Sequence, residues 1–416
     1  MKNAPKSLRL QIGIFGRMNV GKSSFLNMVS GQDFAITSHV PGTTTDAVEK
    51  TMELLPVGPV VFLDTAGVDD TSTLSDLRIK KGQKIFDRSD IILLVIESGK
   101  WDKYEDEIID EAKSREIPVI AIVNKSDIAP PTDKFIETFN KKTQGVIVCS
   151  SLNTEARDGY VEELKQCLID LCPDDFMKPP VLAGSLVPPG GVVLMIVPID
   201  MEAPKGRIIL PQVQMIRETL DNDASAIVVK ETGYMAQLDN LKNPPDLVIC
   251  DSQVVLRMVK ETPPDVACTT FSIIFAKNKG DLTGMARDAS RIKDLKPGDR
   301  VLIAEACSHH PIEDDIGRVK IPRWLEEYVG GSLNIDSCAG RDFPEDIEEY
   351  KLVIHCGACM ITRREMLSRM RRAGGKSVPI TNYGVCIAYL TNVLERVLTP
   401  FPDALEAFQE AEKEKK

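Results

Sequence analysis

Several features are scarce in this chain of 416 residues, and each scarcity argues against a class of protein. No apolar stretch approaches the ~20 residues that a membrane-spanning helix needs, so we expect no membrane contact. Aromatic residues make up only 5% of the chain, Lys and Arg form no long stripe, and the formal net charge is −11. This composition argues against a nucleic-acid partner. The first residues show no signal-peptide pattern, so we expect a cytoplasmic protein.

Cysteine and histidine are few and unevenly placed. None of the ten cysteines precedes Cys149, whereas five fall between Cys307 and Cys386. Cysteines of an intracellular chain are usually reduced, metal-bound or buried. The pattern C-x-x-x-C-x-x-C of radical-SAM enzymes is absent, which disfavours a catalytic iron–sulfur enzyme.

The chain is long enough for two or three domains, and its patterning predicts α/β architecture throughout. Near-continuous apolar runs alternate with helix-length stretches, which indicates a parallel sheet covered on both faces. We predict a first domain with a doubly wound, mostly parallel sheet over residues 1–173. Its strands are expected at 8–15, 60–63, 91–96, 118–123 and 145–149, and its last helix at 160–171.

Two smaller α/β domains are expected to follow, at 174–276 and 277–416. The first shows no catalytic constellation, so we assign it to packing or dimerisation. Its helix 211–220 places Val213, Ile216 and Leu220 on one face. We expect its strands at 192–197, 226–229, 247–250 and 271–275. In the last domain we expect strands at 300–305, 351–355 and 378–380, and helices at 362–373 and 385–398.

A phosphate-binding loop follows the first strand. Residues 16–23, GRMNVGKS, fit G-x-x-x-x-G-K-S between a strand and a helix. Backbone N–H groups of such a loop wrap phosphates, Lys22 faces the outer phosphates, and the Ser23 hydroxyl binds Mg²⁺. A later G-G-K-S at 374–377 lacks the first glycine and does not form a second site.

Four further motifs specify GTP, so the domain predicted over residues 1–173 is a P-loop GTPase domain. Residues 124–127, NKSD, follow a strand, and Asp127 can accept hydrogen bonds from guanine that adenine does not offer. Residues 64–67, DTAG, end another strand, residues 149–152, CSSL, can seat the base, and residues 41–46 occupy the switch I position. We predict catalytic roles for Lys22, Thr44 and Gly67 and Mg²⁺ contacts from Ser23, Thr44 and Asp64. The predicted GTP-binding residues are Gly16, Asn19, Val20, Gly21, Lys22, Ser23, Ser24, Asp64, Gly67, Asn124, Lys125, Asp127, Ser150 and Ser151.

Val68 stands where Ras-like enzymes carry a glutamine that orients water, so unaided hydrolysis should be slow. Together with Asn19 in the phosphate loop, this resembles the TrmE/Era/Der branch of GTPases. The resemblance implies a K⁺ ion held by Asn19 that stimulates hydrolysis.

The second signal is a Cys–His motif near the C-terminus. Cys307 and His309 follow one predicted strand, and residues 355–359, HCGAC, follow another, giving C-x-H…H-C-x-x-C. Both halves lie where strands of an α/β sheet end, the usual place for a site. The residue types alone leave three possibilities open: unrelated buried cysteines, a zinc site, or an iron–sulfur cluster with three thiolates.

The GTPase motifs, the middle domain without a motif, and this Cys–His motif together resemble the HydF family of [FeFe]-hydrogenase maturation GTPases. The resemblance covers nearly the whole chain. It implies that Cys307, Cys356 and Cys359 hold a [4Fe–4S] cluster. It also implies a homodimer or higher homo-oligomer that accepts a transient di-iron precursor from radical-SAM maturases and delivers it to apo-[FeFe]-hydrogenase.

The fourth ligand stays open at this point. His309 or His355 are the motif candidates, with His310, Glu313, Asp314 and Asp315 as competitors. Cys338 and Cys386 are interpreted as buried structural thiols. The arginines at 363, 364, 369, 371 and 372 form either a solvated helix face or a site for an anionic precursor or partner. The alternative function is a tRNA-modification or ribosome-assembly GTPase with a C-terminal zinc module.

Overall fold

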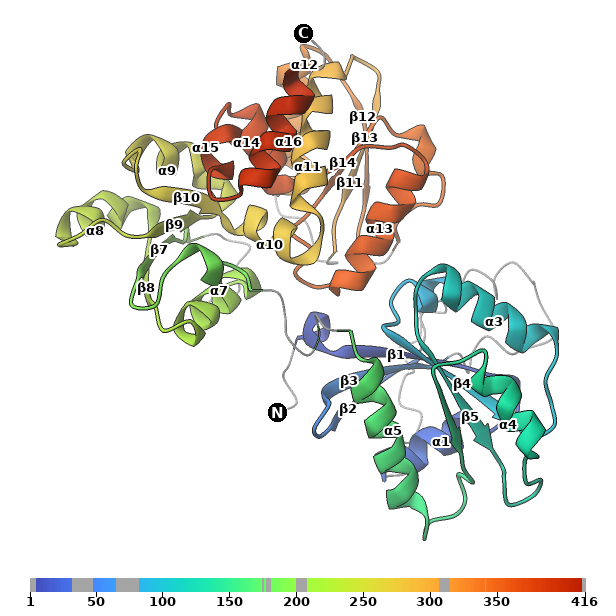
Figure 1. Ribbon diagram of the computed structural model, residues 1–416. Coiled ribbons are helices and arrows are strands. Elements are labelled where there is room, and N and C mark those ends of the chain that lie inside the picture. Colours follow the sequence, from blue (N-terminus) through green and yellow to red (C-terminus); the bar gives the residue numbers. More distant parts are fainter. Residues whose placement is uncertain are drawn as a thin grey trace. The chain divides into compact units, whose positions relative to one another are not determined.

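The computed structural model describes residues 5–31, 48–64, 82–173, 176, 181–199, 208–306, 315–340 and 342–413. The chain forms two compact units, Met1–Pro179 and Pro180–Lys416 (Figure 1). A helix with the length and apolarity needed to cross a bilayer is absent from the described ranges.

The first unit is a doubly wound α/β sandwich. Its described strands follow the order β2-β3-β1-β4-β5-β6, parallel except at the β2–β3 pair. One core contains Phe25 and Leu164 from α1 and α5, and the other contains Ile109 and Phe139 from α3 and α4. The sheet is therefore covered on both faces, as predicted. Its elements are β1 (Leu10–Phe15), α1 (Lys22–Ser30), β2 (Val48–Leu54), β3 (Gly58–Asp64), β4 (Ile91–Glu97), α3 (Lys103–Ser114), β5 (Val119–Asn124), α4 (Asp133–Asn140), β6 (Gly145–Val148) and α5 (Arg157–Leu171).

The second unit contains two parallel four-stranded sheets in its described part, with orders β10-β9-β7-β8 and β12-β11-β13-β14. The elements around the first sheet are β7 (Val192–Ile196), α7 (Leu210–Asp221), β8 (Ser225–Val229), α8 (Tyr234–Asn240), β9 (Leu247–Cys250), α9 (Val255–Glu261) and β10 (Ala267–Thr270). Those around the second are α10 (Phe271–Lys279), α11 (Leu282–Ala289), β11 (Arg300–Ala304), α12 (Ile321–Val329), β12 (Asn334–Cys338), β13 (Leu352–His355), α13 (Arg363–Gly375), β14 (Ile380–Asn382), α14 (Tyr383–Leu390), α15 (Leu394–Leu398) and α16 (Pro402–Lys413).

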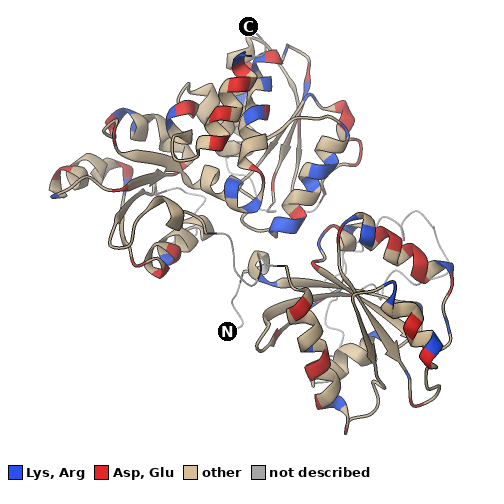
Figure 2. Ribbon diagram, viewed as in Figure 1, with Lys and Arg blue, Asp and Glu red and all other residues tan. Residues whose placement is uncertain are grey.

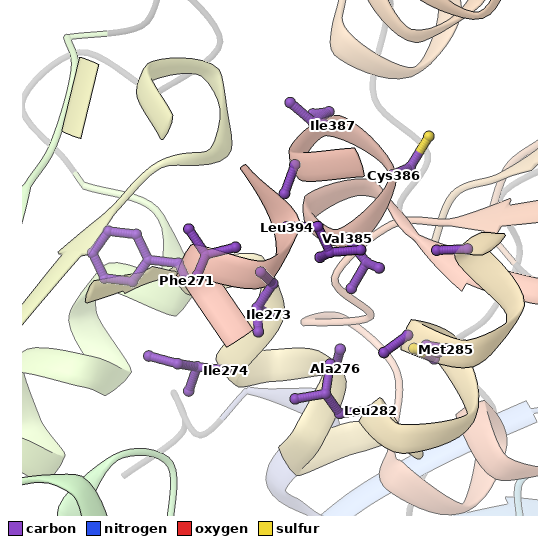
Figure 3. Close-up of a cluster of buried hydrophobic side chains, with 14 of the residues drawn as sticks. Phe271, Ile273, Ile274, Ala276, Leu282, Met285, Val385, Cys386, Ile387 and Leu394 are labelled. Carbon is purple, nitrogen blue, oxygen red and sulfur yellow. The ribbon is translucent and has the colours of Figure 1, made fainter. Parts of the chain in front are cut away.

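One hydrophobic core runs through both sheets of this unit. Figure 3 shows side chains of α10 and α11, among them Phe271 and Met285, in one cluster with Val385 of α14, and α10 and α11 both pack against α14. Polar ties add to it, since Asn382 Nδ2 donates to the Ser272 carbonyl at 2.9 Å. The two sheets therefore share one core, and a domain boundary at residues 276 and 277 stays a prediction.

Helix α10 corrects one sequence expectation, because residues 271–275 were expected to form a strand. The strand β10 ends just before them, and the Thr270 hydroxyl accepts a hydrogen bond from the Ile273 amide at 3.2 Å, capping the helix. Phe271, Ile274 and Phe275 are all buried because α10 packs against α7, α11, α13 and α14. A helix that is apolar all round has no 3.6-residue periodicity to distinguish it from a buried strand.

Other elements differ in smaller ways. The helix expected at 385–398 is two helices, α14 and α15, separated at Asn392, whose φ is 59°. The edge strand β12 was not expected, because its residues are mostly exposed and polar. In α7 the face with Val213 and Leu220 lies outward, at 45% and 57% exposure, while Met215 is buried.

The cap of α10 gives a stability prediction. Thr270→Ala removes the only hydroxyl that accepts from the Ile273 amide in the described structure and should lower the unfolding free energy of the second unit by about 1 kcal/mol. Urea unfolding followed by circular dichroism measures the shift. Thr132→Ala, which removes the exposed cap of α4, is the control and should leave the transition of the second unit unchanged. Equal transitions for wild type and Thr270→Ala would show that packing alone fixes the start of α10.

Candidate functional site

The phosphate loop joins β1 to α1 and is shaped by left-handed backbone. Asn19 has φ 62° and Gly21 has φ 96°. A Cβ on Gly21 would stand 2.3 Å from the Asn124 amide nitrogen, so glycine is required there. The buried Lys22 ammonium donates to the carbonyl of Gly16 at 2.6 Å and closes the loop around itself. Ser23 and Ser24 are exposed at the start of α1, where backbone N–H groups attract anions.

Asn124 connects three of the predicted motifs. Its side chain is 1% exposed, and its Nδ2 donates to the Val20 carbonyl at 3.0 Å. Its Oδ1 accepts from the backbone amide and the hydroxyl of Ser151, at 3.0 and 2.8 Å. The phosphate loop, the base-recognition loop and the loop after β6 are therefore held to one another by one amide. The neighbouring Ser150 is buried.

The remaining predicted residues lie around this hub. Asp64 ends β3 beside Ile14, which is two residues before the phosphate loop begins. Lys125 has φ 60° and its Nζ lies 3.1 Å from Glu97 Oε2. Asp127 is exposed on the turn that follows. Thr44, Gly67 and Val68 lie outside the described residues.

Arg17 was not singled out by sequence reasoning. Its guanidinium pairs with Asp102 and with Glu105, whose Oε2 lies 2.7 Å from Arg17 Nη2. These two carboxylates raise the pKa of Arg17 above its usual value. Because Asp102 and Glu105 also form the capping box of α3, Arg17 fixes the phosphate loop to the start of that helix. The usual G-x-x-x-x-G-K-S pattern leaves this position unspecified, so the motif gave no signal for it.

The second predicted site lies at the carboxyl edge of the sheet β12-β11-β13-β14. Strand β11 pairs with β13 so that Ala304 stands beside His355, and two residues after Ala304 the Ala306 amide donates to the Cys356 Sγ at 3.0 Å. The loop from Cys356 to Cys359 turns through Ala358, with φ 56°. Cys307 directly follows Ala306 but lies, like His309, His310, Glu313 and Asp314, outside the described residues.

Buried charged side chains lie near this loop. Burial raises the pKa of Cys356, and the charge of Arg369 partly offsets this rise. Burial also raises the pKa of Cys359 to about 11, and the charge of Lys279 acts in the opposite direction. Arg369 and Lys279 are 4% and 5% exposed. Figure 2 shows Lys and Arg along α13, the helix that carries Arg369. Thiolates carry negative charge, and nearby cations and N–H donors stabilise them.

His355 is fully buried, and both of its ring nitrogens have partners. Nδ1 lies 2.8 Å from the Cys356 carbonyl oxygen, and Nε2 lies 3.0 Å from Arg369 Nη1. A guanidinium can only donate, so Nε2 accepts and Nδ1 carries the proton. Burial, reinforced by Arg369, lowers the pKa of His355 to about 3, which keeps the ring neutral.

The arginines of α13 have separate partners. Arg363 Nη1 donates to the Asn278 and Gly280 carbonyls at 2.6 and 3.1 Å and so caps the end of α10. Arg372 donates to the Phe343 carbonyl and stacks on that ring, while Arg371 is exposed. The interpretation of these arginines as one uniform solvated face is therefore wrong for Arg363, Arg369 and Arg372.

Other predicted residues are placed as follows. Asp315 is buried, and its carboxylate accepts from the Arg318 amide at 2.8 Å. Cys386 is buried in the core, as predicted, whereas Cys338 is only partly buried (Figure 3 shows Cys386). The Thr362 hydroxyl accepts a hydrogen bond from the Glu365 amide and so caps α13. The Glu365 carboxylate lies 3.3 Å from Arg369 Nη2. Among the described residues no group of three or more His, Cys, Asp and Glu side chains is arranged to hold a metal ion.

Sequence comparisons place the first unit among GTPases. A family model described as 50S ribosome-binding GTPase matches residues 11–125. The tRNA modification GTPase MnmE of Synechococcus sp. strain JA-2-3B'a(2-13) is 40% identical over 124 residues, covering 29% of this chain and 26% of that protein. MnmE of Prochlorococcus marinus strain NATL1A is 32% identical over 163 residues, 38% of this chain and 34% of that protein. The chain thus spans about a quarter to a third of these relatives.

Solved structures resemble part of the chain. The match to the G domain of the T. maritima FeoB iron transporter covers 39% of this chain and 98% of that chain, with a TM-score of 0.31 and 21% identity. A probable GTP-binding protein engB covers 38% of this chain and is covered to 99%, with a TM-score of 0.30 and 16% identity.

Two further family models match the second unit. Residues 182–280 match the hydrogen maturase F dimerization domain, and residues 283–400 match the hydrogen maturase F tetramerization domain. These matches divide the unit between its two sheets and follow directly after a GTPase domain. With all three models in this order, the chain belongs to the hydrogen maturase F family.

Proposed function

We propose that this protein is a GTP-hydrolysing scaffold that holds a [4Fe–4S] cluster and a di-iron precursor and delivers the precursor to apo-[FeFe]-hydrogenase. One observation carries the cluster assignment. The half-buried Cys356 thiol accepts a hydrogen bond from the backbone N–H of Ala306, the residue that precedes Cys307 in the sequence. N–H···S bonds and burial are the means by which proteins tune iron–sulfur clusters. Cys307, Cys356 and Cys359 would hold the cluster, which supplies an iron open to exchange.

The GTPase unit would bind GTP with Mg²⁺ through Ser23, Thr44 and Asp64. Asn124 supports this proposal, since it fixes the phosphate loop relative to the base-recognition loop. Asn19, exposed and in left-handed backbone, is the proposed K⁺ contact. Hydrolysis would change how the cluster-binding region meets radical-SAM maturases and apo-hydrogenase.

The base selectivity can be tested through Asp127. Asp127→Asn removes the carboxylate that accepts from guanine and should weaken GTP binding about 10- to 100-fold, following a loss of roughly 1–3 kcal/mol. Titration with a fluorescent GTP analogue measures the affinity, and Asp133→Asn, an exposed carboxylate at the start of α4, is the control. An unchanged affinity would remove Asp127 from base recognition. Replacing KCl with NaCl in the hydrolysis assay tests the K⁺ ion.

Metal analysis separates the cluster from zinc. Anaerobic purification and reconstitution should give iron and sulfide of about four each per chain and a broad brown absorbance. Cys356→Ser should lose them, while Cys386→Ala, which changes a thiol in the core of the same unit, should retain them. Colourless protein with one zinc, still without iron after reconstitution, would contradict the scaffold and favour an RNA-linked GTPase.

The first sheet of the second unit is the proposed dimer contact. Strand β8 is the last strand of its sheet in the described structure. Val228 on β8 and Val213 and Leu220 on α7 are each more than 40% exposed. An uncovered strand edge beside apolar side chains invites pairing with another chain.

The proposed dimer contact can be tested by introducing charged side chains on this face. Val213→Glu with Leu220→Glu places two carboxylates on this face and should convert dimers to monomers in analytical ultracentrifugation. Leu256→Glu, on the exposed face of α9 in the same unit, is the matched control and should leave the mass unchanged. If the double variant keeps the wild-type mass, the dimer forms elsewhere.

A further inference from the structure

The buried Arg369–His355 pair lies directly beneath the predicted cluster loop, and the motif alone does not explain it. His355 is one of the two histidines of C-x-H…H-C-x-x-C and is therefore a candidate ligand by sequence. In the structure its Nε2 accepts from Arg369 and its Nδ1–H donates to the Cys356 carbonyl. Neither nitrogen offers a lone pair to iron while these bonds are in place.

Arg369 is held from several sides. Its Nη2 donates to the Gly340 carbonyl at 2.6 Å and lies 3.3 Å from the Glu365 carboxylate, and its guanidinium stacks 5.3 Å from the Phe343 ring centre. Its Nε is buried and has no acceptor within the described parts of the chain. The guanidinium is thus fixed in place next to His355.

Buried charges of both signs lie near the loop. Arg369 and Glu365 form one buried ion pair. The charge of Arg369 lowers the pKa of Cys356, and that of the buried Glu305 raises it. Three thiolates with a [4Fe–4S] core carry a net negative charge, which the guanidinium of Arg369 would stabilise.

We propose that Arg369 and His355 are positioning residues for the cluster rather than ligands. This rests on the proposed function and deepens it. Arg369 fixes the neutral tautomer of His355, whose Nδ1–H then holds the Cys356 carbonyl and orients the loop. The fixed charge of Arg369 favours the reduced, more negative cluster. The fourth ligand is consequently not His355.

The test uses the reconstituted full chain and two variants. Arg369→Met with Glu365→Gln removes both members of the buried ion pair, so that neither charge is left alone. We expect a more negative cluster reduction potential in redox titration followed by EPR, and about 10-fold or greater loss of iron affinity in chelator competition. Arg369→Lys keeps the charge and should restore most of the potential. Arg372→Gln is the control, since Arg372 stacks on the same Phe343 ring.

Histidine ligation is read independently by pulsed EPR of protein labelled with ¹⁵N-histidine. His355→Asn should leave any strongly coupled histidine nitrogen in place. Loss of that coupling in His355→Asn would overturn the proposal, and so would an unchanged potential in the Arg369→Met, Glu365→Gln variant with full cluster content. Thermal melting of the cluster-free variants checks that they fold. Wild-type protein that takes up no iron would defeat the proposed function and this inference together.

Discussion

The register of the parallel strands is the constraint on which both sites depend. In a parallel sheet all strands end at one edge, so residues far apart in sequence are brought together only where the pairing aligns them. In the first unit, β1 and β3 pair Ile14 with Asp64 and thereby set the predicted Mg²⁺ carboxylate beside the phosphate loop. In the second unit, the pairing of Ala304 with His355 brings residues 306 and 356 within hydrogen-bond distance. A slip by one residue would turn these side chains to the other face.

Each site also has one buried polar side chain that connects its loops. Asn124 does so in the GTPase unit, where its side-chain N–H donates to the Val20 carbonyl and its side-chain oxygen accepts from the Ser151 amide. Arg369 does so beneath the cluster loop, through His355, Gly340 and Glu365. The two differ in charge. A neutral amide can be buried once its hydrogen bonds are made, whereas a guanidinium also needs negative charge nearby.

Sequence patterns predicted the GTPase fold of the first unit because its motifs are local. The phosphate loop, Asn124 and the strands that precede them are found within short stretches whose spacing carries the chemistry. The failures were of two kinds. Residues 271–275 are apolar whichever element they form, and only the cap at Thr270 and packing on several sides make them helical. Strand β12 is polar and exposed, so no hydrophobic pattern marks it.

The role of His355 shows a further limit of motif reasoning. The sequence shows a histidine next to a cysteine pair, and its residue type fits a metal ligand. What decides its role is Arg369, fourteen residues away on another element, which occupies the nitrogen a metal would need. Arg369 in turn resembles the other arginines of α13 in sequence, yet Arg363 caps α10 and Arg371 is exposed. A buried cation is recognised only once the fold shows what surrounds it, because burial is a property of tertiary packing and not of the helix that carries the residue.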